Sequence, residues 1–210
     1  MSEEITGDDF YLSPRTKKVS RFTVQGSRFI AKIAPCSSEE EAQRLLSEVV
    51  DEYPDATHHA YALRIGMKST LIERANDDGE PAGTAGAPML QFLKGKNISD
   101  VLIVGTRYFG GIKLGIGGLT RAYRDCARIS LEQSDLTRKE SLSDYILEFN
   151  YEDLGAVTRI VESSGGTIIA SEYSDKVLLK ARIPSRSDLT FTEGFESACR
   201  GRGTLKKFSG

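Results

Sequence analysis

Apolar and polar residues alternate over positions 19–33 around Gly26, and this period of two predicts two strands joined by a turn or bulge. After them, Ser38 is a suitable helix N-cap with Glu41 three residues later, and apolar residues recur at helical spacing until Pro54. That segment is therefore predicted to be a helix with one apolar face.

Two further strands are predicted for residues 57–66 and 69–76, with a turn at Gly66 between them. His58 and His59 stand side by side at the start of the first of these strands. Neighbouring strand residues point to opposite faces of a sheet, so a metal ion shared by the two imidazoles is not expected.

The centre of the chain holds a continuous apolar run, residues 101–105, that ends in glycine. Such a run is typical of a strand covered on both faces. From Leu119 onward, apolar residues recur at helical spacing. The glycine-rich stretch RYFGGIKLGIGGLTR, residues 107–121, is therefore predicted to connect a strand to a helix.

The second half has the pattern of a ferredoxin-like domain. Its predicted order is strand, helix, strand, strand, helix, strand, over residues 144–151, 154–161, 167–173, 176–184, 188–199 and 204–208. This order forms an antiparallel sheet with two helices on one face, so the fold class is α+β. Residues 138–143 are mostly polar. We therefore predict a polar tail over residues 1–18, a first domain over residues 19–138 and a second domain over residues 143–210.

Composition excludes several classes of protein. The 210 residues are 39% hydrophobic and 28% charged, which is ordinary for a soluble globular chain. There is no apolar run of the roughly 20 residues needed to span a membrane, and the start does not resemble a signal peptide, so a cytoplasmic protein without a membrane partner is expected. Cys36, Cys126 and Cys199 are far apart and odd in number, and we expect them to be reduced packing residues.

The charge is unevenly distributed although the net charge is only −2. Residues 37–55 carry seven acidic residues against one basic residue, whereas residues 91–128 carry seven basic residues against two acidic ones. Such a distribution can build a local basic surface on a chain that is acidic overall.

The glycine-rich stretch has the layout of an anion site, because backbone amides at a helix start can bind an anion when no side chain obstructs them. Lys113 lies inside this stretch. The order matches neither a Walker motif nor a dinucleotide fingerprint. The alternative is that the glycines, Gly110, Gly111, Gly115, Gly117 and Gly118, provide turns with positive φ and close packing against the sheet.

Basic side chains follow on the predicted helix. Arg121, Arg124 and Arg128 share one face that a phosphate backbone could contact, but Asp125 lies in the middle of that face and intrahelical ion pairs compete with this interpretation. Tyr108 and Phe109 lie next to Arg107 and Lys113, a combination suited to stacking on unpaired bases. One of these two aromatic residues is expected in the core, because strand neighbours alternate faces.

The stretch NDDGEPAGTAGAP, residues 76–88, is acidic and rich in turn residues. Asp77, Asp78 and Glu80 offer three carboxylates that could hold a hydrated Mg²⁺ or act as acid and base. The same residues are equally suited to tight turns, which is the alternative interpretation.

The motifs DDGEPAGTAGAPML (residues 77–90) and VLIVGTRYFGGIKLGIGGLTRAYRDCA (residues 101–127) resemble the IMPACT family in its bacterial YigZ-type branch, and the resemblance runs from about Val19 to the C terminus. It implies a first domain similar to a ribosomal-protein and elongation-factor fold, with a sheet backed by helices on one side. It also implies a second domain similar to the ferredoxin-like last domain of elongation factor G. Eukaryotic relatives carry an additional N-terminal domain that engages an activator of an initiation-factor kinase, and the resemblance does not extend to that partner role.

The resemblance further implies a translation regulator, with binding of RNA or the ribosome by bacterial members, and it transfers no catalytic residue. We therefore expect a non-enzymatic protein without a cofactor that binds RNA or the ribosome. The expected binding residues are Arg107, Tyr108, Gly110, Gly111, Lys113, Gly117, Gly118, Arg121 and Arg124. One alternative is a Mg²⁺-dependent phosphotransferase or hydrolase of small molecules, with the metal ion on Asp77, Asp78 and Glu80. Another is a protein-binding adaptor in translation control.

Overall fold

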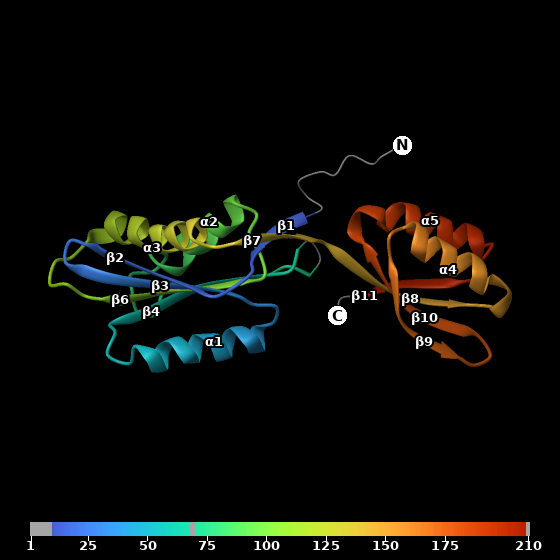
Figure 1. Cartoon of the computed structure of the whole chain (residues 1–210), viewed down its shortest axis with the longest axis horizontal. Coiled ribbons are helices and arrows are strands. Elements are labelled where there is room, and N and C mark those ends of the chain that lie inside the picture. The colour runs from blue at the N-terminus through green and yellow to red at the C-terminus, as the bar shows by residue number, and fades with distance from the viewer. Residues whose placement is uncertain (1–9, 68–69, 209–210) are drawn as a thin grey trace. The chain divides into compact units, whose positions relative to one another are not determined.

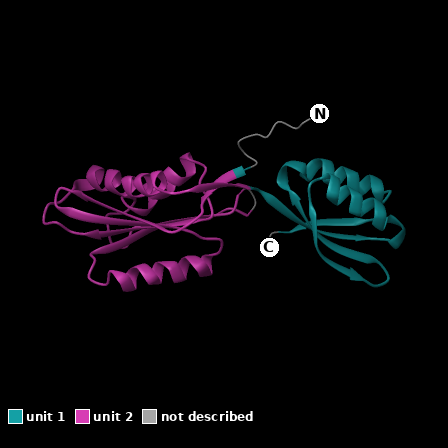
Figure 2. Ribbon diagram, viewed as in Figure 1, with its two compact units in different colours: residues 1–10, 140–210 teal, residues 11–139 magenta. Residues whose placement is uncertain are grey.

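The computed structural model describes residues 10–67 and 70–208, and Figure 1 labels their helices and strands. The chain divides into two compact units, one formed by residues 11–139 and the other by residues 140–210 with Phe10 (Figure 2). Each unit has its own antiparallel sheet, helices and hydrophobic core. The fold class is α+β, as predicted.

A five-stranded antiparallel sheet in the order β2-β3-β6-β4-β5 forms the centre of the first unit. Its strands are β2 (Lys18–Val24), β3 (Ser27–Pro35), β4 (His58–Ile65), β5 (Ile72–Asn76) and β6 (Val101–Tyr108). The central strand β6 is buried along its whole length except for its last residue, as the apolar run predicts. The turn between β2 and β3 is at Gln25 and Gly26, which both have positive φ.

Helices cover both faces of this sheet. Figure 1 shows α1 (Glu39–Glu52) on one face and α2 (Gly86–Gly95) and α3 (Gly115–Glu132) on the other. The expectation of helices on one side only is therefore wrong. The reason lies in β6, where Ile103 packs in the core under α2 and α3, whereas its neighbour Leu102 packs in the core under α1.

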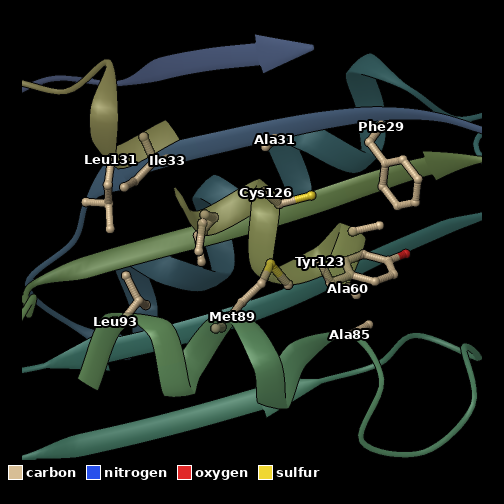
Figure 3. Packing of buried hydrophobic residues seen from close by; sticks show 14 of the residues in the cluster. Phe29, Ala31, Ile33, Ala60, Ala85, Met89, Leu93, Tyr123, Cys126 and Leu131 are labelled. Atoms are coloured by element: carbon tan, nitrogen blue, oxygen red, sulfur yellow. The ribbon is translucent and has the colours of Figure 1, made fainter. Parts of the chain in front are cut away.

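The larger core lies between the sheet and the pair α2 and α3 (Figure 3). The ring of Tyr123 on α3 meets the ring of Phe29 on β3 edge to face, with 5.4 Å between the centroids. A Cβ at Gly105 would lie 2.9 Å from Tyr123 Cδ1, so the glycine that ends the apolar run allows α3 to pack closely on β6. This contact fixes where the start of α3 lies relative to the end of β6.

The start of α1 follows the predicted capping pattern. Ser38 Oγ accepts a hydrogen bond of 3.1 Å from the Glu41 amide, and the Glu41 carboxylate accepts one of 2.9 Å from the Ser37 amide. The helix ends at Glu52, shortly before Pro54.

Two short strands lie where the sequence predicted none. β1 (Phe10–Pro14) pairs with β7 (Leu136–Glu140) in a separate two-stranded sheet, so the segment predicted as a polar tail contains a strand. The side chains of β7 are mostly polar and only partly buried, which is why hydrophobic patterning does not reveal the strand. Residues 1–9 of the predicted tail lie outside the described residues.

The second unit has the predicted ferredoxin-like topology. Its elements are β8 (Leu142–Phe149), α4 (Leu154–Ser163), β9 (Thr167–Tyr173), β10 (Val177–Pro184), α5 (Asp188–Ala198) and β11 (Thr204–Phe208). The sheet order is β11-β8-β10-β9, and all its pairs are antiparallel. Figure 1 shows α4 and α5 together on one face of this sheet.

We predict that Leu93→Ala destabilises the first unit, because Leu93 of α2 is fully buried in its larger core. Removing such a side chain costs about 2–5 kcal/mol of unfolding free energy. Urea denaturation measures this loss.

Leu189→Ala is the matched control, because Leu189 is 69% exposed and its loss is expected to stay within about 0.5 kcal/mol. Equal stability of the two variants would contradict the core described for α2.

Candidate functional site

The two sequence motifs meet at a buried ion pair between Glu80 and Arg107. Arg107 Nη1 lies 2.8 Å from Glu80 Oε1, and the two side chains are only 6% and 3% exposed. Tyr123 donates a hydrogen bond of 2.9 Å to the same carboxylate oxygen, and Arg107 Nη2 donates one of 3.1 Å to Ser27 Oγ. The pair thus connects the loop after β5, the end of β6, the start of β3 and α3.

The chemistry around this pair keeps Tyr123 protonated. Burial of the hydroxyl, together with the charge of Glu80 and the hydrogen bond to it, raises the pKa of Tyr123 far above its usual range. The phenol is therefore a hydrogen-bond donor to Glu80 at all physiological pH values.

His58 completes the polar cluster. Its Nε2 lies 4.0 Å from Glu80 Oε2, and its Nδ1 lies 2.6 Å from the backbone oxygen of Asp78. A carbonyl oxygen can only accept, so Nδ1 carries the proton of this hydrogen bond. The loop of the acidic motif is thus attached to the start of β4 through His58.

Asp77 has a structural role in the same loop. Its carboxylate accepts hydrogen bonds of 2.7, 3.0 and 2.9 Å from the amides of Gly83, Ala85 and Gly86, at the start of α2. Burial acts to raise the pKa of Asp77, but these three hydrogen bonds outweigh it and lower the pKa below its usual value. The charged carboxylate therefore stabilises the loop and the N-terminus of α2.

The three acidic side chains do not converge. Asp78 Oδ2 accepts a hydrogen bond of 2.6 Å from the His59 amide, so Asp77, Asp78 and Glu80 each bind a different protein partner. Among the residues that the structure describes, no three acidic, histidine or cysteine side chains are grouped as metal ligands. In this structure backbone amides and Arg107 bind the three carboxylates, which are therefore not brought together as the ligands of one Mg²⁺ ion.

The glycine-rich loop, residues 109–114, is held against the β2–β3 turn. A Cβ at Gly110 would lie 2.0 Å from the carbonyl carbon of Gly26, and Gly111 has a φ of 86°. Close packing and positive φ therefore account for these two glycines.

The spacing of apolar residues predicted that the helix after the loop begins at Leu119. In the structure it begins four residues earlier, at Gly115. Gly117 and Gly118 thus lie in its first turn. No side chain caps this end, so the amides of the first turn point outward as possible donors to an anion.

Three exposed cations, Lys113 just before α3 and Arg121 and Arg124 within it, are called here the basic surface of α3. They form no ion pair with any residue in the ranges 10–67 and 70–208. A Cβ at Gly117 would lie 3.4 Å from Arg121 Nη1, so this guanidinium lies over the first turn. Arg124 lies 5.9 Å from the centroid of the Phe92 ring.

Arg128 behaves differently from the other two arginines of α3. It pairs with Asp125 at 2.9 Å and with Glu132 at 3.0 Å. The intrahelical ion pairs therefore involve Arg128, and Asp125 pairs with Arg128 instead of Arg121.

Neither aromatic residue of the motif belongs to the core, contrary to the expectation for one of them. Tyr108 is half-buried, donates a hydrogen bond of 2.8 Å to Asp55 and has Arg28 at 4.1 Å from its ring centroid. Phe109 is 47% exposed. The alternation argument fails because β6 ends at Tyr108 and Phe109 already belongs to the loop.

Arg107 was expected on an exposed binding surface, but the structure buries it with Glu80. The further residues that contact this ion pair were not singled out as site residues from the sequence: Ser27 accepts from Arg107, whereas His58 and Tyr123 contact Glu80. They come from three different elements, so no local spacing could reveal them.

The three cysteines are packing residues, as predicted. All are free and buried, and burial raises the pKa of Cys36 to about 11 and that of Cys199 above its usual value. A protonated, buried thiol is a poor nucleophile. In the part of the chain that the structure describes, no helix is both long and apolar enough to cross a bilayer.

Comparison with family models finds two matches. Residues 25–131 match the Impact N-terminal domain, and residues 147–202 match a domain of unknown function (DUF1949). Glu80, Arg107 and the basic surface of α3 all fall within the first match.

Relatives are similar over most of the chain. The IMPACT family member YigZ of Escherichia coli (strain K12) is 36% identical over 179 residues, which are 85% of this chain and 88% of that protein. Protein IMPACT of Mus musculus is 32% identical over 141 residues, which are 65% of this chain and 43% of that protein. A solved structure titled as that of a hypothetical protein is 34% identical, with a TM-score of 0.68, and the match covers 96% of this chain and 98% of that one.

Breaking the buried ion pair is expected to be costly. Glu80→Gln leaves the Arg107 charge buried without its counter-charge, and such a loss lowers the free energy of unfolding by about 3–5 kcal/mol. The double variant Glu80→Gln/Arg107→Met should lose less than the sum of the two single variants, which a double-mutant cycle in urea measures. Lys17→Met, which removes an exposed pair with Glu48, should change stability by at most about 1 kcal/mol. If the losses of the Glu80 and Arg107 variants simply added in the double variant, the two residues would not be coupled.

Asp77→Asn is expected to destabilise the protein at neutral pH and progressively less in acid. Since the folded-state pKa of Asp77 lies below its ordinary value of 3.8, its contribution is fully present above that value and is lost as pH falls through the lower folded-state pKa. The difference in unfolding free energy between wild type and variant should therefore shrink in that range. The exposed Asp51→Asn is the control, and a difference independent of pH would refute the charged role of Asp77.

Proposed function

The chain belongs to the IMPACT family, and from this premise we propose that it is a non-enzymatic protein that binds RNA, free or on the ribosome, in the regulation of translation. The family resemblance of the motifs implies regulators of translation, and the cytoplasm is the proposed place of action. The binding surface we propose is the glycine-rich loop with the basic surface of α3.

The observation that supports this proposal is that Lys113, Arg121 and Arg124 form no ion pair with a described residue and lie just before or along a helix whose start has no side-chain cap. Exposed cations that lack counter-charges on the protein can neutralise phosphates and release their counterions. The amides of the first turn of α3 add further donors for a phosphate oxygen. The exposed ring of Phe109 lies on the same loop and suits contact with unpaired bases.

The acidic motif supports the same proposal indirectly. Its carboxylates are occupied by Arg107 and by backbone amides, so they do not compete for the exposed cations of α3. The surface therefore keeps its positive charge on a chain whose net charge is −2.

Charge reversal tests the proposal. Arg121→Glu/Arg124→Glu should weaken binding of a labelled single-stranded RNA. If each arginine contacts one phosphate, the slope of log K against log salt should become less negative by about 0.7 for each contact removed. Fluorescence anisotropy at several salt concentrations measures both effects.

Arg44→Glu/Arg159→Glu is the matched control, because it changes the net charge equally on exposed residues of α1 and α4. It should retain the wild-type slope. Sedimentation of cell lysate gives a second test, in which the wild type travels with ribosomal particles at low salt and the α3 variant does not. Wild-type affinity and slope in the α3 variant would refute the assigned surface.

A further inference from the structure

A pocket of about 340 Å³ lies between the loop of the acidic motif and the start of α3. One side is formed by Glu80 and Pro81, and the other by Phe109 and the residues from Lys113 to Ile116. Arg107 and Leu119 complete the lining. The two motifs that are separate in the sequence thus share one concave site.

The walls of this pocket are mostly apolar, and part of them is open to solvent. Pro81, Leu114 and Leu119 contribute to the lining, while Phe109 is 47% exposed and Ile116 71% exposed. The Arg107 guanidinium lies 5.5 Å from the centroid of the Phe109 ring, so a cation and an aromatic ring lie close together in the lining. A flat aromatic ligand in the pocket would bury the exposed side chains of Phe109 and Ile116.

Arg107, one of the residues that line the pocket, also has a polar atom without a partner. Arg107 Nε is buried and has no hydrogen-bond acceptor among the described residues, although the side chain is only 6% exposed. A buried N–H without an acceptor is unfavourable, and an acceptor on a ligand would offset that cost. The ring nitrogens and carbonyl oxygens of a nucleobase are such acceptors.

The rim beside the polar group is positive. Lys113 and Gly115 line the pocket, the first turn of α3 is uncapped, and Arg121 lies over that turn. A phosphate at the rim would meet backbone amides and two cations, while a base attached to it reached the apolar walls. The pocket thus offers complementary surfaces to both halves of a nucleotide.

We propose that this pocket binds one nucleotide unit, with its base against Phe109 and Ile116 and its phosphate at the start of α3. The unit is supplied either by a free nucleotide or by an unpaired residue of RNA. The inference deepens the proposed RNA-binding function and rests on it.

The test compares two labelled ligands of equal length, a single-stranded RNA and an abasic ribose-phosphate oligomer. Phe109→Ala should weaken RNA binding between about 5-fold and about 150-fold, the range observed for loss of one base–aromatic stack, and should leave binding of the abasic oligomer unchanged. Phe109→Trp should retain RNA binding. The Phe109 amide donates to Thr57 Oγ1 at 3.1 Å, a backbone contact that all these variants keep.

Tyr173→Ala, at a 59% exposed aromatic residue of β9, is the matched control and should bind both ligands as the wild type does. Wild-type RNA affinity in Phe109→Ala would overturn the base pocket. If Arg121→Glu/Arg124→Glu binds both ligands normally while Phe109→Ala still weakens RNA binding, the basic surface fails and the pocket stands. If Arg121→Glu/Arg124→Glu weakens binding while Phe109→Ala binds RNA normally, the basic surface is supported and the pocket is overturned.

Titration with nucleoside monophosphates distinguishes the two sources. The amide resonances of Phe109, Gly115 and Ile116 should shift on binding. Saturable shifts with a monophosphate that also displaces RNA identify the free nucleotide as a ligand, and shifts with RNA alone identify an unpaired RNA residue. Either result supports the pocket, and an absence of shifts with both ligands overturns it.

Discussion

The buried ion pair of Glu80 and Arg107 is the interaction on which the candidate site depends. A single buried charge is strongly unfavourable, so each residue requires the other. Tyr123 and Ser27 satisfy further hydrogen-bonding groups of the pair and thereby attach α3 and β3 to it. One electrostatic requirement thus holds the loop after β5 next to the glycine-rich loop.

The same pairing explains how a slightly acidic chain presents a positive surface. Glu80 is neutralised by Arg107 and Asp125 by Arg128, while the charged carboxylate of Asp77 accepts hydrogen bonds from the amides at the start of α2. These three acids therefore have partners other than the cations of the basic surface of α3. The cations left at the surface, Lys113, Arg121 and Arg124, act together with the positive end of α3.

Patterning predicted most of the secondary structure for a physical reason. The two strands around Gly26, the capped helix after Ser38, and β8, β10, α4 and α5 of the second unit each bury one face, and burial leaves a periodic trace in the chain. β9, by contrast, is exposed along its whole length. β7 was missed because its side chains are mostly polar and only partly buried. β1 contains apolar residues, but with five residues it is too short to show a clear alternating pattern. The start of α3 was misplaced by four residues because Gly115, Gly117 and Gly118 give no helical signal.

The sequence alone determined most of the helices and strands, the division of the chain into two domains and the two motifs that form the site. Only the tertiary structure decided which charges lie inside. Arg107 and Glu80 are 27 residues apart, and Tyr123 and Glu80 are 43 apart, so their meeting depends on how β6, α3 and the intervening loop pack. Periodicity assigns a side chain to a face of its own element, whereas burial and pairing depend on the elements that cover that face.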